Sequence, residues 1–421
     1  MKKVDVVIGL QWGDEGKGKI VDVLTPKYKV VARFQGGPNA GHTLEFDGKK
    51  MVLHTVPSGI FRENSINIIG NGVVVDPVIL MDEIKKINAI GVPTAGKILL
   101  SKKAHLILPT HRILDAAQEA AKGGAKIGST LKGIGPAYTD KVSRSGLRAG
   151  DVLRPDFSQK YAALKQKHVA LLKQLGYPFS VEEQEREWLQ SIEQLRGELT
   201  IIDSEYEVNE LLKQGSILAE GAQGSMLDVD FGSYPFVTSS STVCAGACTG
   251  LGVAPSSIGE VIGIFKAYCT RVGSGPFPTE LHDEVGAQLS RQGNEFGSTT
   301  GRARRCGWLD LVALRYSIMV SGATQLFMMK ADVMDNFDAI RVCVAYRING
   351  AATDRYPYEV DTPIEPVYEE FRGWKKPVSG CRTEKDLPQE LLDYVKFIEL
   401  QTGVPVKFIS VGPDRSETVL R

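Results

Sequence analysis

Residues 9–20 read Gly9-Leu10-Gln11-Trp12-Gly13-Asp14-Glu15-Gly16-Lys17-Gly18-Lys19-Ile20, and this stretch decides the fold. It follows the apolar run Val4–Ile8 and leads into Lys19–Leu24, which has a helical pattern. A strand, a glycine-rich turn and the start of a helix together present backbone N–H groups to a phosphate. The sequence therefore predicts a P-loop-like nucleotide site between a strand and a helix.

This turn departs from an ordinary P-loop at two positions. Gly13 to Lys19 matches G-x-x-x-x-G-K, but Ile20 stands where a P-loop has the Ser or Thr that holds magnesium. Asp14 lies inside the turn, where its carboxylate repels phosphates unless a cation bridges them or the carboxylate handles a proton. We therefore expect a phosphate site with an acid of its own. A tight turn with solvated charges is the alternative.

The composition is that of a globular protein whose net charge is close to zero. The 421 residues include 50 Lys and Arg and 50 Asp and Glu, so anionic ligands must be held by local clusters rather than by net charge. Six cysteines are too few for a disulfide scaffold in so long a chain. There is no signal-like segment, and no apolar run approaches the roughly 20 residues that cross a bilayer. We expect a cytoplasmic protein with no nucleic-acid or membrane partner.

Apolar runs alternate with helical patterns along most of the chain. The expected strands are Val4–Ile8, Val30–Phe34, Ile66–Ile69, Ile98–Leu100, Ser216–Ala219, Val261–Tyr268, Gln325–Met329 and Val406–Val411. The expected helices are Pro77–Ile90, Pro109–Ala121, Trp308–Val320 and Pro388–Leu400. This alternation predicts an α/β fold with a large, mostly parallel twisted central sheet flanked by helices.

Two features interrupt the alternation. Asp47-Gly48 lies between Leu44–Phe46 and Met51–His54 and predicts a small hairpin on the flank of the sheet. Long charged helical segments fill residues 156–212 without a Pro- or Ser-rich linker on either side. We therefore expect one large domain, residues 1–421, that includes a helical excursion at about 156–212.

A second glycine-rich loop, Gln35–Thr43, follows the second expected strand. Asn39 offers both a donor and an acceptor to a base or a sugar. His42 is one of only six histidines and is able to donate a proton to an oxygen that gains charge. A loop histidine with an ordinary structural partner is the alternative.

Two further stretches suggest anion and base recognition. Residues 293–305 carry three hydroxyls and three arginines between glycines, which suits carboxylates or phosphates, although an exposed basic loop is the alternative. Lys330-Ala331-Asp332 ends an expected strand and resembles the guanine-reading motif of GTPases, in which the carboxylate accepts from N1 and N2 of the base. A glycine-rich loop at 128–136, together with Arg144, suggests a second anion. Two sites for phosphate groups imply that the protein binds two nucleotides, or a nucleotide and a phosphorylated metabolite.

Taken together, these motifs resemble those of the adenylosuccinate synthetase family, the GTP-dependent ligases of AMP synthesis. The resemblance runs from Val4 to the end of the chain. It rests on Gln11 to Lys19, Gly37 to Thr43, Gly133 to Tyr138, Glu220 to Gly224 and Gly301 to Arg305. It implies that IMP, L-aspartate and GTP give adenylosuccinate, GDP and phosphate through a 6-phosphoryl-IMP intermediate. This is the first committed step of AMP synthesis from IMP.

The resemblance also implies a role for each site residue. Asp14 would take the proton from N1 of IMP so that O6 attacks the γ-phosphorus, and His42 would act as a general acid at O6. The catalytic set would be Asp14, His42, Lys17 and Gln223. Magnesium, the implied cofactor, would be held by Asp14 and Gly41, which accounts for Ile20.

The implied binding residues fall into three groups. GTP would be bound by Gly13, Asp14, Glu15, Gly16, Lys17, Gly18, Lys19, Gly41, His42, Thr43, Arg304, Lys330, Ala331, Asp332, Ser410, Val411 and Gly412. IMP would be bound by Asp14, Lys17, Asn39, Ala40, Gly41, His42, Thr130, Arg144, Gln223, Thr238 and Arg302, with Arg144 supplied by the partner in a homodimer. Aspartate would be bound by Ser298, Thr299, Thr300, Gly301, Arg302 and Arg304. Leu131 departs from the family pattern, for which we expect a glycine or a polar residue there, and this puts loop flexibility and IMP affinity in doubt, but not the reaction.

Two other functional classes fit parts of the pattern. A GTP-binding regulatory module would need only one phosphate site, and Asp14, Ile20 and the second anion loop count against it. A P-loop ATP-dependent carboxylate ligase or kinase would prefer ATP and give Asp332 no role.

Overall fold

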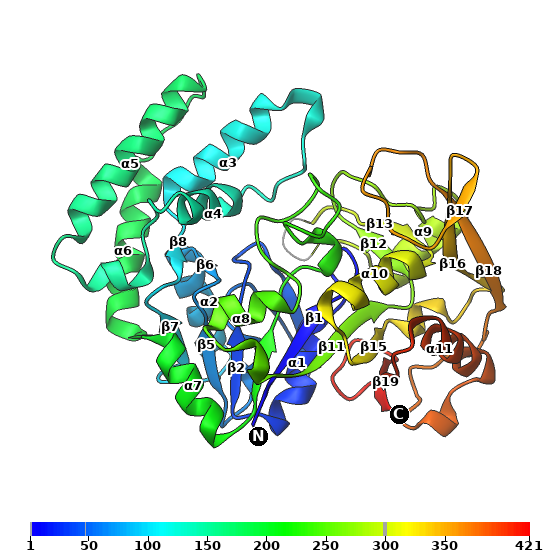
Figure 1. The fold of residues 1–421 in the computed structure, drawn as a ribbon. Helices are drawn as coiled ribbons and strands as arrows, with labels where there is room; N and C mark the ends of the chain where they lie inside the picture. Colours follow the sequence, from blue (N-terminus) through cyan, green and yellow to red (C-terminus); the bar gives the residue numbers. More distant parts are fainter. Residues whose placement is uncertain (1, 47, 298–300) are drawn as a thin grey trace.

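The computed structural model of the chain describes residues 2–46, 48–297 and 301–421 (Figure 1). Within these ranges, ten strands form one sheet in the order β20-β19-β15-β11-β1-β10-β2-β5-β7-β9. Neighbouring strands are parallel except for β19 and β20. The strands are β1 (Val4–Gly9), β2 (Val30–Arg33), β5 (Ile66–Ile69), β7 (Ile98–Ser101), β9 (Thr200–Ile202), β10 (Ile217–Glu220), β11 (Ile258–Lys266), β15 (Gln325–Met329), β19 (Val406–Ser410) and β20 (Thr418–Leu420). The expected α/β fold is confirmed.

Helices pack on both faces of this sheet. They are α1 (Lys17–Leu24), α2 (Pro77–Ala89), α3 (Pro109–Ala121), α4 (Ile134–Val142), α5 (Phe157–Gln174), α6 (Glu182–Glu198), α7 (Ser204–Gln214), α8 (Ala245–Leu251), α9 (Glu284–Gly293), α10 (Leu311–Ser321) and α11 (Gln389–Thr402). On one face, Ile20 and Val21 of α1 are fully buried with Val7, Leu218 and Ile264 of the strands. Alternate residues of the same strands face the opposite side, where they pack with α7, α8, α10 and α11. Ile20 therefore serves the core between α1 and the sheet.

The eight strands expected for the central sheet all lie in it, and the differences within this sheet are at short strands. β9 and β20 have three residues each, too few for a recognisable apolar pattern. The helix expected at Trp308–Val320 begins at Leu311, because the Asp310 carboxylate caps it by accepting from the Ala313 N–H at 3.0 Å. Residues 309–310 form the short strand β14 instead.

The expected hairpin is present as β3 (His42–Phe46) and β4 (Lys49–Leu53), in which Phe46 pairs with Lys49. Asp47, half of the expected turn, lies outside the described residues. The hairpin begins at His42, which pairs with Leu53. This pairing fixes the backbone of His42 and therefore the direction of its side chain.

The range expected as a helical excursion contains α5, α6 and α7 but also the edge strand β9, so the chain rejoins the sheet at Thr200. Figure 1 shows α3, α4, α5 and α6 gathered on one side of the molecule. Asp140 of α4 joins three of these helices: its Oδ2 lies 2.9 Å from His111 Nε2 of α3 and 2.7 Å from His168 Nε2 of α5.

A second sheet near the C-terminus was not expected from the sequence. β16 (Ala339–Ile348) pairs antiparallel with β17 (Ala351–Thr353) and β18 (Glu365–Arg372), and parallel with β14 (Leu309–Asp310). β6 (Val74–Val75) pairs with β8 (His105–Leu106), and β12 (Cys269–Arg271) pairs with β13 (Arg305–Gly307). Among the helices in the described ranges, we find none with the length and apolar character needed to cross a membrane.

Candidate active site

A cavity of about 920 Å³ opens where the parallel strands of the central sheet end. Its walls come from the segments that follow β1, β10, β15 and β19, together with the loops at 39–43, 127–130 and 236–239 and residues near Arg302 and Arg304. Ligands of open α/β sheets bind at this edge because the loops after parallel strands collect there. The glycine-rich stretches singled out in the sequence therefore meet in one place.

The turn after β1 has the backbone shape expected of a phosphate cradle. Gly13 and Gly16 have φ of +84° and +90°, and Asp14 between them has φ of +59°. Gly16 is the N-cap of α1, so the N-terminal amides of this helix open toward the cavity. Asp14 is a non-glycine residue in left-handed backbone, and this conformation keeps its carboxylate at the cavity wall.

Glu15 and Lys17 form a buried pair inside this turn. Glu15 Oε1 accepts from the backbone N–H groups of Gln11 at 3.1 Å and Gly13 at 3.0 Å, while its Oε2 accepts from Lys17 Nζ at 2.5 Å. Lys17 Nζ also donates to the carbonyl of Gln223. The Glu15 side chain thus braces the turn from within, where its carboxylate is occupied by donors of the protein itself.

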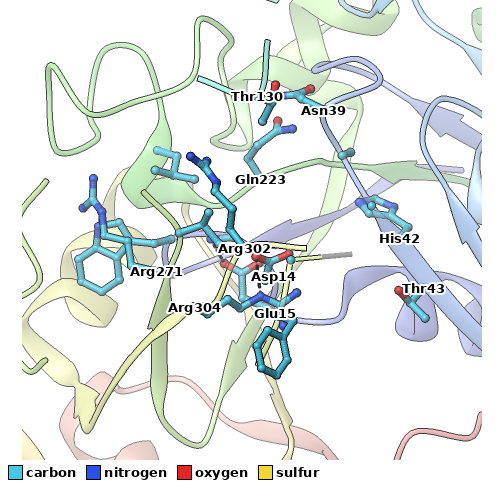
Figure 2. A pocket seen from close by; sticks show the side chains of 18 of the residues that line it. Asp14, Glu15, Asn39, His42, Thr43, Thr130, Gln223, Arg271, Arg302 and Arg304 are labelled. Atoms are coloured by element: carbon cyan, nitrogen blue, oxygen red, sulfur yellow. Dashed lines mark hydrogen bonds and ion pairs between the residues drawn. The ribbon is translucent and has the colours of Figure 1, made fainter. Parts of the chain in front are cut away.

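Asp14 forms an ion pair with an arginine at the cavity wall. Arg304 Nε donates to Asp14 Oδ2 at 2.9 Å, and the Asp14 side chain retains 28% of its exposure. Figure 2 shows Arg304 directed toward Asp14, with Gln223, Asn39 and Thr130 on one side and His42 on another. The Arg302 side chain instead points away from Asp14, and its NH2 donates to the Gly128 carbonyl at 2.8 Å. An acid, two arginines, an amide group and an imidazole therefore surround the same space.

His42 is oriented by a buried carboxylate. Its Nδ1 contacts Glu220 Oε1, while Ser58 donates to Glu220 from both its backbone N–H at 2.7 Å and its hydroxyl at 2.6 Å. Burial lowers the pKa of His42 to about 4, assisted by the charge of Arg33 and opposed by Glu220. Burial works to raise the pKa of Glu220, but the contacts with His42, Arg33 and Ser58 prevail and lower it. His42 Nε2 is buried without a hydrogen-bond partner among the described residues and lines the cavity.

Two amide side chains also present unpaired polar atoms at the cavity. Both amide atoms of Gln223 and the Oδ1 of Asn39 are buried, and none has a hydrogen-bond partner within the described ranges. Gln223 has φ of +56°, so its backbone is held in an unfavourable region. Buried polar atoms normally have hydrogen-bond partners. Where such atoms line a cavity and lack a partner, they indicate where a polar ligand binds.

The loop expected to bind a second phosphate is held by carboxylates of α3. Glu119 accepts from the N–H groups of Gly128 at 2.6 Å and Ser129 at 3.2 Å, and Asp115 accepts from the N–H of Gly133 at 2.9 Å. These three amides are therefore occupied by the protein's own carboxylates. Thr130 lines the cavity beside them, and its neighbour Leu131 is 46% exposed with φ of +56°.

At the opposite end, β15 delivers Lys330 and Asp332 to the cavity. Lys330 Nζ donates to the Gly293 carbonyl at 2.6 Å and to Glu295 Oε1 at 2.7 Å. Asp332 Oδ1 is buried without a partner among the described residues, and burial raises the pKa of this carboxyl group. A buried acceptor of this kind suits the paired N–H groups of a guanine edge.

Lys19 supports this end of the cavity from behind. Its Nζ donates to Ser410 Oγ at 2.8 Å and to the Gly412 carbonyl at 2.6 Å, and burial lowers its pKa to about 8. In this structure Lys19 therefore anchors the segment after β19, and it does not point from α1 toward a phosphate.

The comparisons with known proteins agree with this geometry. The family model described as "Adenylosuccinate synthetase" matches residues 6–419. The chain belongs to the adenylosuccinate synthetase family. An adenylosuccinate synthetase of Parabacteroides distasonis is 62% identical over 420 residues, which cover 100% of this chain and 99% of that protein. One from Flavobacterium johnsoniae is 58% identical, with 99% of this chain and 100% of that protein covered.

A solved structure extends the agreement to the fold. The structure of a fully ligated adenylosuccinate synthetase from Plasmodium falciparum superposes with a TM-score of 0.94 at 38% identity, covering 100% of both chains. The central sheet and the loops at its edge therefore have the arrangement of this family.

Most residues that the family resemblance singled out line the cavity. They are Gly13, Asp14, Glu15, Gly16, Lys17, Gly18, Lys19, Asn39, Ala40, Gly41, His42, Thr43, Thr130, Gln223, Thr238, Arg302, Arg304, Lys330, Asp332, Ser410 and Gly412. Ala331 and Val411 are fully buried beside the base end of the cavity, and Gly301 is exposed and outside its wall. Arg144 is exposed and also outside the wall. Ser298, Thr299 and Thr300 lie outside the described residues.

Two histidines and an aspartate of the kind that bind metals lie buried between α3, α4 and α5, outside the cavity, and form a hydrogen-bond network. His111, Asp140 and His168 bring three possible ligand atoms within 4.8 Å of one another. The N–H of Leu108 donates to His111 Nδ1 at 2.9 Å, so the proton of this imidazole sits on Nε2 and points at Asp140. Without a lone pair on Nε2, His111 is not a metal ligand in this arrangement.

Sequence reasoning gave no role to four acids that shape the site. Glu220 orients His42, Glu295 binds Lys330 and Arg304, and Asp115 and Glu119 hold the loop at 128–133. Glu220 ends the strand β10, and a charged residue at the end of an otherwise apolar strand is a signal of a functional role that is visible in the sequence. The other three have no local pattern that distinguishes them from surface acids.

Proposed function

We propose that this cavity joins L-aspartate to IMP at the expense of GTP, the reaction of the adenylosuccinate synthetase family. Family membership makes the chain a GTP-hydrolysing ligase of AMP biosynthesis. What remains to be assigned is which residue performs each task, and the geometry of the cavity supports the following division of roles.

GTP would lie between the turn after β1 and the segment after β15. The amides at the start of α1 and Lys17 would hold the phosphates, as helix N-termini hold anions. Asp332 would accept from N1 and N2 of guanine, and the stem of Lys330 would pack on the base. Ser410 and Gly412, anchored by Lys19, would line the base pocket.

IMP would occupy the part of the cavity next to Asp14 and His42. Gln223 and Asn39 carry the buried polar atoms that lack partners among the described residues, and a purine nucleotide supplies both donors and acceptors for them. Thr130, Thr238 and Arg302 line the same region and complete the expected contacts.

The chemical steps follow from the position of these groups. Asp14 would take the proton from N1 of IMP, and the electron pair shifts to O6, which attacks the γ-phosphorus of GTP while the bond to the β-phosphate oxygen breaks. The products are GDP and 6-phosphoryl-IMP. The neutral amine of aspartate then adds at C6, the C6–O6 bond breaks so that O6 leaves with the phosphate, and the new C–N nitrogen releases its extra proton to solvent. The poor leaving oxygen of IMP thus departs as phosphate. Lys17 and His42 would stabilise charge that develops on the phosphoryl group and on O6.

His42 must carry a proton on Nε2 to act at O6. In the free protein its pKa is about 4 because it is buried near Arg33, so the neutral imidazole with its proton toward Glu220 predominates at neutral pH. The negative charge of Glu220 would favour the imidazolium form, and so would the phosphates of GTP next to it. Glu220 is therefore the group that makes a general-acid role of His42 feasible.

The donor set at this end fits magnesium. Mg²⁺ is usually held by one or two carboxylates with substrate phosphates and water, and Asp14, which supplies a carboxylate, and Gly41, which supplies a backbone carbonyl, both line the cavity. Ile20 faces the core, so Asp14 takes over the task that Ser or Thr has in other P-loops. When bound, the metal would neutralise charge on the phosphate oxygens. Asp14 Oδ2 would then exchange its contact with Arg304 for the new ligands.

Aspartate and a second subunit complete the proposal. Arg302 and Arg304 line the cavity, and with residues 298–301 they would bind the carboxylates of aspartate. Arg144 is exposed outside the cavity, which is compatible with a role in the IMP site of the partner in a homodimer. We also infer that residues 1–421 work as one domain, because the central sheet takes strands from both ends of the chain.

The observation that carries the proposal is one cavity lined by Asp14, His42 and Asp332, whose buried Oδ1 has no hydrogen-bond partner in the part of the chain that the structure describes. The test is phosphate release from GTP by the purified protein. We expect release to require IMP and aspartate together. Hydrolysis of GTP by the protein alone, at a rate that neither substrate changes, would contradict the ligase and favour a regulatory GTP-binding module.

A further inference from the structure

Glu295 is a fully buried carboxylate between the two ends of the cavity. It lies just after α9, and its backbone carbonyl accepts from the N–H of Arg304 at 2.9 Å. Its side chain is 0% exposed and accepts from Lys266 Nζ at 3.1 Å through both oxygens, and from the Tyr268 hydroxyl. No step of the proposed reaction uses this group, and it does not line the cavity.

Two of its partners belong to different parts of the site. Glu295 Oε1 accepts from Lys330 Nζ at 2.7 Å, and Oε2 accepts from Arg304 NH1 at 2.6 Å. Arg304 in turn donates from Nε to Asp14 Oδ2 at 2.9 Å. A continuous chain of charged groups therefore runs from the residue that would pack on guanine to the acid that would take the proton.

The charges of this chain are mutually dependent. Burial works against the ionised form of Glu295, but Lys266, Lys330 and Arg304 outweigh it and hold its pKa well below the ordinary range. Lys266, which is buried and whose pKa is lowered to about 8, keeps its proton with the help of Glu295. Without this carboxylate, three cations would face one another in a region of low dielectric, where repulsion is strong.

We propose that Glu295 is a positioning residue that fixes Lys330 and Arg304 on one carboxylate and thereby links guanine binding to the alignment of Asp14. The inference rests on the proposed function, and it adds a coupling between two sites that would otherwise act separately. A triphosphate whose base does not engage Lys330 would leave Arg304 less well held, and turnover would fall together with affinity.

The test compares Glu295→Gln with a matched control in the same segment. Gln keeps the shape and removes the charge. The control is Glu280→Gln: Glu280 accepts from Arg305 Nε at 2.7 Å, next to Arg304 in the chain, but contacts neither Lys330 nor Asp14 in any hydrogen bond or ion pair of the described residues. Both proteins are assayed for kcat and for the KM of GTP, IMP and aspartate, with folding checked by circular dichroism.

For Glu295→Gln we expect the KM of GTP to rise and kcat to fall, each by about tenfold or more, since charge-assisted hydrogen bonds are lost at both ends. The KM of IMP should change less than about threefold, because Asn39, Thr130, Gln223 and Thr238 do not contact Glu295. Glu280→Gln should change each parameter less than about threefold. Two outcomes would overturn the proposal in favour of a purely structural role. One is an equal change in the KM values of GTP, IMP and aspartate, and the other is no change in either the KM of GTP or kcat.

A second experiment tests whether Glu295 affects GTP binding through Lys330. In a Lys330→Met background, Glu295→Gln should raise the KM of GTP no further but should still lower kcat, because Arg304 loses its anchor. Full additivity in GTP KM would overturn the link. If Glu295→Gln does not fold, the cycle of Lys330→Met with Arg304→Lys decides: non-additive effects on kcat/KM support the shared carboxylate, and additive effects refute it.

The failure of this proposal is distinguishable from failure of the proposed function. The wild-type protein alone tests the function, through the requirement of phosphate release for both IMP and aspartate. The Glu295 variants are read only against that wild-type activity.

Discussion

Replacement of Asp332 by Asn should change which base the protein selects. The carboxylate is buried, its Oδ1 has no partner within the described ranges, and burial raises its pKa. Guanine presents two N–H donors at N1 and N2, which match an acceptor-only group. An Asn side chain offers one acceptor and one donor, so its NH₂ group would face the 2-amino group of guanine. Xanthine, with a carbonyl at C2, is complementary to Asn instead.

The size of the effect follows from the bonds exchanged. With GTP, Asp332→Asn replaces two hydrogen bonds to a charged acceptor, worth about 1.5–3 kcal/mol each, by one neutral bond worth about 1 kcal/mol. The net loss is about 2–5 kcal/mol, so kcat/KM for GTP should fall at least about 30-fold. With XTP, the variant gains a complementary pair and removes the repulsion between a carboxylate and the C2 oxygen. We therefore expect XTP to become the preferred triphosphate.

The assay measures kcat/KM for GTP, ITP, XTP and ATP with saturating IMP and aspartate. Asp335→Asn serves as the control, because Asp335 is also buried but accepts from Trp374 Nε1 at 2.8 Å and the Val378 N–H at 3.2 Å, away from the base. This control should retain the wild-type base preference. Stability of Asp332→Asn should equal or exceed that of the wild type, since a raised pKa means that the ionised carboxylate costs folding free energy at neutral pH. A variant that still prefers GTP over XTP would refute the guanine-reading role.

Three further changes probe the other groups. Asp14→Asn should abolish phosphate release while the circular dichroism spectrum stays native, and near-normal turnover would exclude Asp14 as the base. Glu220→Gln should lower kcat about tenfold or more and move the high-pH limb of the kcat profile to lower pH, because loss of the negative charge lowers the pKa of His42 further; a high-pH limb that does not move would argue against this. Leu131→Gly should stabilise the protein by up to about 1 kcal/mol in thermal unfolding, since Leu131 occupies left-handed backbone that glycine adopts freely, and a lowered melting temperature would contradict that account.

The central sheet could be predicted because its strands are buried on both faces. Continuous apolar runs such as Ile66–Ile69 and Gln325–Met329 coincide with β5 and β15. The second sheet escaped prediction, since β18 (Glu365–Arg372) has no buried residue and carries charged residues on both faces, which is not the pattern of a core strand. β9 also escaped, because three partly exposed residues between two helices carry no periodic signal.

The residues that line the cavity were predictable where they are contiguous in sequence, and the contacts that hold them were not predictable where they depend on long-range pairing. The phosphate turn and the Lys330–Asp332 segment are contiguous, so their types and spacing identify them. The loop at 128–133 was expected to offer its amides to a phosphate, whereas Glu119 occupies two of them from α3. A hydrogen bond of this kind joins residues whose side-chain directions are set only by the tertiary fold, and spacing does not encode it.

If Asp14 acts on both GTP and IMP as proposed, its pairing with Arg304 gives a physical account of how one carboxylate would serve two substrates. In the free protein the arginine compensates the charge of Asp14, which avoids an isolated carboxylate next to the phosphate turn. In the proposed reaction, GTP with a divalent cation would provide a stronger partner for Asp14. Arg304 would then be available for an anionic ligand without leaving Glu295, which accepts from its NH1. Because Nε and NH1 contact different acids, the guanidinium can exchange one while it keeps the other. Lysine lacks this two-sided geometry, so Arg304→Lys should impair the exchange even where it preserves the charge.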